Sequence, residues 1–180
     1  MTPDRQRIPV RTTLLAALAA GLIAACSQGG SDGGKKLAAV ELNPGTTCSL
    51  DGMLLADYPG PKAQIFYGDR PEPDFFCDTV EMFSIYLKPE QVRPVKAIFV
   101  QDMGKADWNQ PRDSWIDAKT AWYVIGSSRT GSMGPTIASF AQQADARTFA
   151  ETYGGKVLAF DAVTPDMAVL DGGVLHDSKM

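Results

Sequence analysis

Histidine is nearly absent from this sequence of 180 residues, which contains one histidine and three cysteines. The single histidine, His176, lies in a polar stretch near the C-terminus. A zinc site built from three histidines or from many cysteines therefore cannot form within one chain. A Ser-His-Asp catalytic triad would depend on this one residue. The shortage of histidine argues against most hydrolases and against hard or intermediate metal ions.

An excess of basic charge is also lacking, because the formal net charge is -4 at pH 7. Phosphate recognition needs clustered Lys and Arg, so a nucleic acid is not expected as a partner. A glycine-rich phosphate loop after a strand is lacking as well. The Gly154-Gly155 pair precedes the expected strand at Lys156. This order is typical of the end of a helix and not of a dinucleotide-binding fingerprint.

The N-terminus has the pattern of a bacterial lipoprotein signal. Three arginines fall within the first eleven residues, and an apolar run over 12–23 is too short to span a membrane comfortably. The run ends in Ile23-Ala24-Ala25-Cys26, which resembles a lipobox. We therefore predict a signal peptide over 1–25 and lipidation of Cys26, and the alternative is an ordinary secretory signal with a chance cysteine. Ser27, where Asp would favour retention in the inner membrane, favours the outer membrane.

The residues that follow predict a tether. Gly, Ser, Asp and Lys dominate after Cys26, so 26–39 is expected to be a lipidated cysteine and flexible linker. The folded region is expected to begin near Val40, and no later segment is apolar enough to cross a bilayer. The protein is thus expected on the periplasmic side of a bacterial membrane, held there by its lipid anchor.

The folded region shows the order strand, strand, helix, strand twice. In the first half Asp78 is expected to cap the helix with Glu81 in a capping box, and in the second half Asp145 is the expected cap. Pro89 and Gly154 mark the two helix ends. The expected strands are 63–67, 75–77 and 95–101 in the first half, and 121–125, 136–140 and 156–160 in the second.

This repeated order predicts an α+β protein formed by internal duplication. The two homologous ββαβ units, with mostly antiparallel sheets, are expected over 40–110 and 111–170, followed by a C-terminal tail over 171–180. Each unit is too small to bury its sheet alone, so the halves are expected to share a core, with the helices covering one face. The alternative is a chance likeness between two α+β units.

Three methionines lie in expected loops: Met53, Met103 and Met133. Met133 is enclosed by glycine and proline, where a flexible apolar side chain is an unusual choice for packing. Each methionine, taken singly, can equally cap the core from a loop. Together with Cys48 they supply the thiolate and thioether ligands that suit Cu(I).

Eight short motifs resemble those of the NosL family, in the expected order and over most of the folded region. They are 48–53, 57–65, 100–103, 115–118, 123–127, 133–134, 139–141 and 154–157. The resemblance implies a lipoprotein with two ββαβ units that is not an enzyme. It further implies Cu(I) binding and delivery of copper towards the copper-sulfide centre of nitrous oxide reductase. The implied partners are a periplasmic NosD-type protein of an associated ABC transporter and, directly or indirectly, the reductase.

The resemblance also implies a set of copper ligands. By motif these are Cys48, Met53, Met103 and Met133. Many family members place a second cysteine directly before the Gly-Met pair, where this sequence has Asp51. A site with two thiolates is thereby put in question, and the remaining cysteine, Cys77, has no counterpart in the family pattern.

Two other classes of function stay open at this point. The first is an enzyme that uses Cys48 or Cys77 as a nucleophile, although no histidine lies nearby in sequence to activate the thiol. The second is a structural or docking lipoprotein in which a disulfide joins these two cysteines, because the periplasm permits disulfides.

Overall fold

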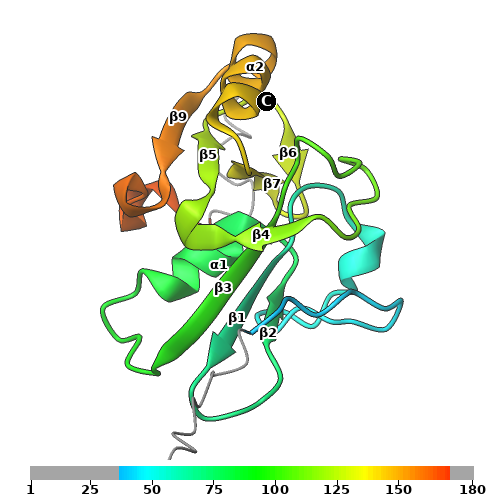
Figure 1. Cartoon of the computed structure of the whole chain (residues 1–180), viewed down its shortest axis with the longest axis vertical. Helices are drawn as coiled ribbons and strands as arrows, with labels where there is room; N and C mark the ends of the chain where they lie inside the picture. Colours follow the sequence, from blue (N-terminus) through cyan, green and yellow to red (C-terminus); the bar gives the residue numbers. More distant parts are fainter. Residues whose placement is uncertain (1–36, 171–180) are drawn as a thin grey trace, which may run out of the picture. The chain divides into compact units, whose positions relative to one another are not determined.

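The computed structural model describes residues 37–170. The predicted signal peptide, the lipidation site Cys26 and the tail with His176 lie outside the described residues. Within 37–170 the chain forms two α-helices and nine strands, so the predicted α+β class is confirmed (Figure 1). No helix in this part of the chain is long and apolar enough to cross a membrane.

The first sheet is antiparallel throughout and has the order β2-β1-β3-β4. All five residues of its central strand β1 are buried, because the sheet is covered on both faces at this strand. The strands of this sheet are β1 (Ala63–Tyr67), β2 (Asp74–Phe76), β3 (Val95–Gln101) and β4 (Trp115–Asp117).

Helix α1 (Thr79–Tyr86) follows β2 directly and lies against this sheet. The side chain of Asp78 accepts a hydrogen bond from the backbone N–H of Val80 at 3.0 Å, which confirms the predicted cap. The capping box is wrong in its second half, since Glu81 faces the interior and contacts Cys48. The helix ends at Tyr86, shortly before the predicted stop at Pro89.

The second sheet has the order β8-β5-β9 and is also antiparallel. In both sheets the first strand of the unit is central, the second lies on one side and the third on the other. This identical arrangement confirms two similar ββαβ units. The elements of the second unit are β5 (Trp122–Ile125), β8 (Ala138–Phe140), α2 (Gln143–Tyr153) and β9 (Lys156–Ala159).

Helix α2 begins earlier than predicted. Its N-cap is Gln142, so the prediction of Asp145 as the cap is wrong. Asp145 lies instead in the first turn, where a carboxylate interacts favourably with the helix dipole. Gly154 adopts a positive φ of 77° and ends the helix as predicted. Ala146 is the one buried residue of α2, so this helix lies on the surface, whereas α1 is buried over most of its length.

Two additions distinguish the second half from the first. The hairpin of β6 (Thr130–Gly131) and β7 (Gly134–Pro135) is inserted between β5 and β8 and carries Met133 at its turn. Strand β4 precedes the second unit and pairs with β3 of the first sheet. The predicted division of the units at 110/111 stays a prediction, and pairing places β4 with the first sheet.

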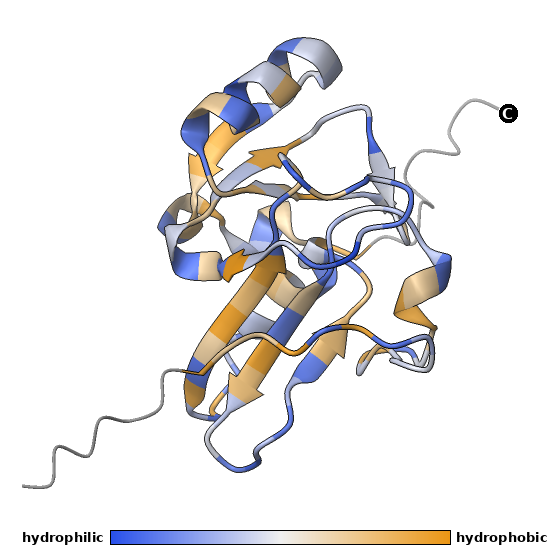
Figure 2. Ribbon diagram, turned by 45° about the vertical axis from the view of Figure 1, so that its right-hand side comes forward, coloured by the Kyte–Doolittle hydropathy of each residue, from blue (hydrophilic) through white to orange (hydrophobic). Residues whose placement is uncertain are grey.

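The largest hydrophobic core is shared by the two halves, as expected from their small size. Phe83 of α1 packs edge-on against Tyr123 of β5, with ring centroids 5.0 Å apart, and lies 5.4 Å from the ring of Phe160. The buried hydroxyl of Tyr123 donates a hydrogen bond to the carbonyl of Ala118 at 2.7 Å, so its polar end is satisfied. Figure 2 shows the hydrophobic residues concentrated along the strands of the first sheet.

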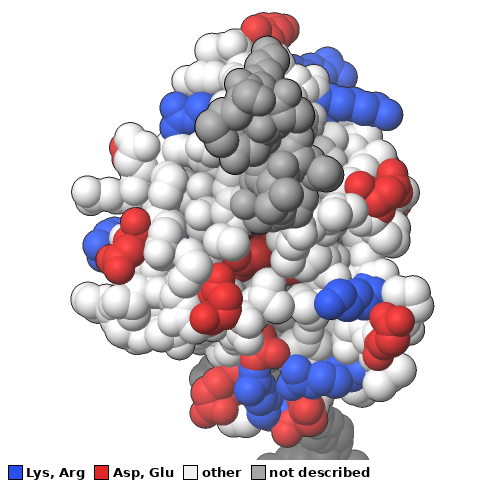
Figure 3. Space-filling model, turned by 180° about the vertical axis from the view of Figure 1, so that it is seen from behind, with Lys and Arg blue, Asp and Glu red and all other residues white. Residues whose placement is uncertain are grey.

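Charged side chains are distributed without a continuous basic patch on the face shown in Figure 3. Three of the four ion pairs among the described residues lie at the end of the first sheet near the β1–β2 connection. Arg93 contacts Asp69 at 2.9 Å and Asp74 at 3.0 Å, and its guanidinium lies over the ring of Tyr67 at 3.6 Å. These contacts hold the strand ends together at the surface.

Candidate metal centre

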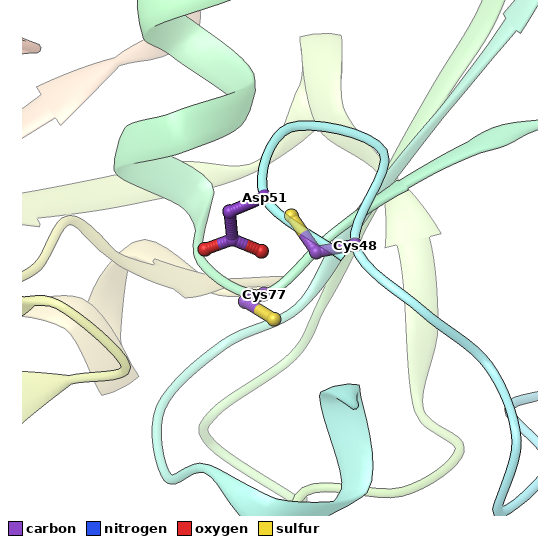
Figure 4. A group of neighbouring side chains, drawn as sticks. All are labelled: Cys48, Asp51 and Cys77. Atoms are coloured by element: carbon purple, nitrogen blue, oxygen red, sulfur yellow. The ribbon is translucent and has the colours of Figure 1, made fainter. Parts of the chain in front are cut away.

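Two buried cysteines that are far apart in the sequence meet beside the N-terminus of α1. Cys48 comes from the loop before β1, and Cys77 lies between β2 and α1. Their sulfur atoms and a carboxylate oxygen of Asp51 all lie within 4.8 Å of one another (Figure 4). Both cysteines are free thiols, 3% and 0% exposed, whereas Asp51 is exposed. The pair can therefore offer two sulfur ligands from the protein interior, with an oxygen at its edge.

A tight turn over residues 48–53 places the carboxylate of Asp51 close to the Cys48 sulfur. The backbone N–H of Cys48 donates to the carbonyl of Met53 at 2.8 Å, and that of Gly52 donates to the carbonyl of Cys48 at 2.9 Å. Gly52 has a φ of +80°, which glycine adopts without strain. The side chain of Asp51 accepts from the N–H of Met53 at 2.9 Å. The Asp-Gly-Met segment is thus the element that shapes this side of the site.

The two thiols differ in acidity. A hydrogen bond from Cys77 is the main cause that lowers the pKa of Cys48 to about 6. The backbone N–H of Leu50, which donates to the Cys48 sulfur at 3.4 Å, acts in the same direction. The pKa of Cys77 is raised, because it donates to Cys48 and is buried beside that negative charge. At neutral pH the pair therefore holds one thiolate and one thiol.

A buried carboxyl group completes the polar side of the centre. Glu81 is 1% exposed, and its Oε2 lies 3.2 Å from the Cys48 sulfur in a hydrogen bond. Burial, followed by the charge of Cys48, raises the pKa of Glu81 to about 8. Its other oxygen has no hydrogen-bond partner among the described residues. Glu81 is thus a carboxyl group that is protonated at neutral pH and has one oxygen free to interact with a ligand.

A lysine lies beneath the thiol pair. Lys62 is 0% exposed, and its ammonium donates hydrogen bonds to the carbonyls of Cys77 at 2.9 Å and Pro59 at 3.0 Å. Burial lowers the pKa of Lys62, and electrostatic interactions with the acidic groups around it, Asp78 first, oppose that effect. A buried cation next to a thiolate favours the ionised sulfur.

Asp78 joins the centre to the second unit. Its side chain is fully buried and accepts hydrogen bonds from the hydroxyl of Thr136 at 2.5 Å and from the N–H of Ser132 at 3.3 Å. Burial raises the pKa of Asp78 to about 6, and these hydrogen bonds oppose the rise. Since Ser132 and Met133 form the turn of the β6–β7 hairpin, Asp78 holds that hairpin beside the residue that follows Cys77.

The methionines predicted as ligands have three different settings. Met53 packs against the cluster that contains both cysteines. Met133 is 41% exposed and lines a cavity of about 410 Å³ together with Asp51 and Glu81. Met103 packs instead against the hydrophobic cluster of the second unit, around Val124. The structure brings Met53 to the thiols and Met133 to the cavity beside them, and it does not bring Met103 to either.

The sequence alone did not assign four residues of this centre to a metal site. Cys77 carried no motif, Glu81 was assigned to a capping box, and neither Lys62 nor Asp78 was assigned to a site. One signal pointed to Cys77, because Asp51 stands where the family pattern has a second cysteine. The structure places the second thiol of this chain close to that position.

The ionisation of the pair gives a first prediction. Thiolate absorbance of the reduced, metal-free protein near 240 nm should rise with a midpoint near pH 6, because Cys48 has the lowered pKa. Cys77→Ala should move the midpoint upward, since it removes the hydrogen bond that stabilises the thiolate. Cys48→Ser should abolish the transition. A wild-type midpoint near the ~8.5 of an ordinary thiol would contradict the asymmetry.

Fold and site together define a class of protein: two ββαβ units with a buried cysteine pair beside a cavity lined from both units. A family model described as NosL matches residues 39–168. The chain is 36% identical to the copper-binding lipoprotein NosL of Stutzerimonas stutzeri over 170 residues, which is 92% of this chain and 88% of the relative. It is 38% identical to the protein of that name in Achromobacter cycloclastes over 160 residues, covering 87% and 81%.

A solved structure agrees with this likeness. The crystal structure of the copper chaperone NosL from Shewanella denitrificans matches with a TM-score of 0.69 and 42% identity, over 73% of this chain and 98% of that one. The chain belongs to the NosL family.

Proposed function

We propose that this protein is a Cu(I)-binding lipoprotein of the periplasmic side that serves as a copper chaperone in maturation of the copper-sulfide centre of nitrous oxide reductase. The observation that carries the proposal is the buried pair of free thiols, Cys48 and Cys77, whose sulfur atoms lie within 4.8 Å of each other. Relatives that are named copper-binding lipoproteins or a copper chaperone support the choice of metal.

The chemistry of the site suits Cu(I). Thiolate and thioether sulfur are soft ligands, and Cu(I) prefers them, whereas Zn(II) and Ni(II) readily take imidazole ligands, which the described residues lack. Cys48 and Cys77 can bind the ion in the interior, and Met133 lines the neighbouring cavity together with Asp51 and Glu81. An exposed methionine at a hairpin turn is also well placed to pass the ion to a partner, because a neutral thioether binds more weakly than a thiolate. Such a site binds copper firmly and still allows ligands to be exchanged one by one.

The proposed setting follows from the N-terminal sequence and the family. Lipid on Cys26 would hold the protein at the membrane, and Ser27 favours the outer membrane. The proposed partners are a NosD-type protein of an ABC transporter and the reductase, reached directly or indirectly. Sucrose-gradient fractionation tests the location, and recovery with inner-membrane markers would contradict it.

The decisive experiment is an anaerobic Cu(I) titration of the reduced mature domain against a competing chelator. We expect one Cu(I) per chain, and transfer of that ion to the metal-free reductase faster than from the chelator alone. Met133→Leu should slow the transfer more than it weakens binding, because the side chain lies at the exposed rim. Absence of stoichiometric binding would exclude the proposed function.

The short distance between the sulfur atoms also favours a second candidate, a structural or docking lipoprotein with a Cys48–Cys77 disulfide. Both cysteines are free in the structure. Thiol titration of the denatured, unreduced periplasmic protein separates the two functions. Two free thiols beyond the lipidated cysteine support the metal site, and none supports the disulfide.

A further inference from the structure

Lys62 is an unusual residue to find at a metal centre. Its side chain is 0% exposed at the start of β1, and its ammonium donates to two backbone carbonyls, one of which belongs to Cys77. Among residues 37–170 no carboxylate oxygen lies within the 4.0 Å of an ion pair with this ammonium. A hydrogen-bonded lysine without a direct counter-ion is costly to bury.

The acidic groups around Lys62 belong to the centre itself. They are the two thiols and the carboxyl groups of Asp78 and Glu81, each close enough to favour its charged form. Asp78 accepts hydrogen bonds from the second unit, and Glu81 Oε2 lies 3.2 Å from the Cys48 sulfur in a hydrogen bond. The thiol pair is the part of this surrounding that would bind the metal ion, and Lys62 is linked to it directly through the carbonyl of Cys77 at 2.9 Å.

We propose that Lys62 sets the charge selectivity of the centre, favouring a monovalent over a divalent metal ion. This inference rests on the proposed function, in which Cys48 and Cys77 bind the metal. A fixed positive charge attracts the two thiolates equally in either complex, but it repels a divalent ion twice as strongly as a monovalent one. In a buried site that difference is weakly screened. The soft sulfur ligands thus favour soft metal ions, and the charge of Lys62 favours monovalent ions among them.

The test compares ions that all bind thiolates and that differ in charge. Ag(I) and Cd(II) both bind thiolates, so their affinity ratio reports charge, and Cu(I) and Zn(II) provide the second pair. Lys62→Gln removes the charge and keeps an amide that can donate to one of the two carbonyls. The preference for the monovalent ion should fall at least tenfold in both pairs, or about 1.4 kcal/mol. Chelator competition measures all four affinities.

Two controls separate charge from structure. Lys62→Arg keeps the positive charge and should keep the wild-type ratio, whatever it does to stability. Gln64→Met removes a buried polar side chain of β1, two residues after Lys62, that forms hydrogen bonds with the backbone of Val40. This variant should also leave the ratio of the two affinities unchanged. If Lys62→Gln lowers the affinity for both ions of a pair by the same factor, Lys62 is only structural and the inference is overturned.

A variant that folds poorly without metal still gives a result. Metal binding stabilises the folded state, so the urea midpoint can be measured in the presence of each ion. Compared with the monovalent ion of its pair, the divalent ion should raise the urea midpoint of Lys62→Gln more than it raises that of the wild type. The nearly isosteric Lys62→Met should behave in the same way. Equal relative shifts for Ag(I) and Cd(II) would overturn the inference. Failure of the wild type to bind any of the four ions would instead refute the proposed function.

Discussion

Cys48→Ser is expected to lower the affinity for Cu(I) at least a hundredfold, the largest effect of any single substitution in the centre. The hydrogen bond from Cys77 lowers the pKa of Cys48 to about 6, so Cys48 is the thiol that loses its proton more readily and binds a metal at the lower cost. A serine hydroxyl is a hard, protonated group that Cu(I) binds poorly. Cys77→Ser should cost less, because its proton must be displaced before it can bind. Anaerobic competition with a chelator measures both losses.

Two methionine substitutions extend this comparison of ligands, and one of them, Met103→Leu, is the matched control. Met103→Leu should leave the affinity unchanged, because Met103 packs against the hydrophobic cluster of the second unit, away from the thiols. Met133→Leu should lower it several-fold, because that side chain lines the cavity shared with Asp51 and Glu81. A Leu–Met exchange typically costs less than about 1.5 kcal/mol of stability, so both variants should fold. X-ray absorption would count the sulfur neighbours of the bound ion. If Cys77→Ser abolishes binding while Cys48→Ser does not, the ranking of the two thiols is wrong.

Gly131→Ala is expected to destabilise the folded protein by about 3 kcal/mol, at the upper end for overpacking of a core. A Cβ at this position would collide with the carboxylate of Asp78 and come within 3.0 Å of the Cβ of Thr136. Asp78 cannot move away freely, because it caps α1 and holds the hairpin that carries Met133. Urea unfolding monitored by circular dichroism measures the loss.

Gly45→Ala is the matched control, since the nearest atom to its added Cβ is a side-chain oxygen of Asn43 at 3.4 Å. It should change the free energy of unfolding by less than about 0.5 kcal/mol. Gly131→Ala should also weaken Cu(I) binding, since displacement of the hairpin moves Met133. An unfolding free energy for Gly131→Ala equal to that of the control would show that Asp78 does not fix the hairpin.

Local sequence determined the elements of this fold and much of their order. Asp78 caps a helix because its short side chain accepts from the backbone two residues on, and Gly154 ends one because it tolerates a positive φ. Both signals act within a few residues and need no tertiary contact. The same reasoning failed at Asp145, where an acidic residue in the first turn resembles a cap. It failed also at Glu81, which has the spacing of a capping box and is drawn into the interior by Cys48.

The sequence by itself also determined that soft ligands were available: Cys48 and Met53 in one turn, and Met133 in another. Only the tertiary structure decided which of them meet. Antiparallel pairing of β1 with β2 places Lys62 beside Cys77, and a hydrogen bond from the N–H of Ser49 to the carbonyl of Phe75 at 2.7 Å holds the Cys48 loop against β2. Met103 is drawn into the second core by packing. Such contacts depend on long-range pairing and on the shape of the core, and no short-range pattern of residue types encodes them.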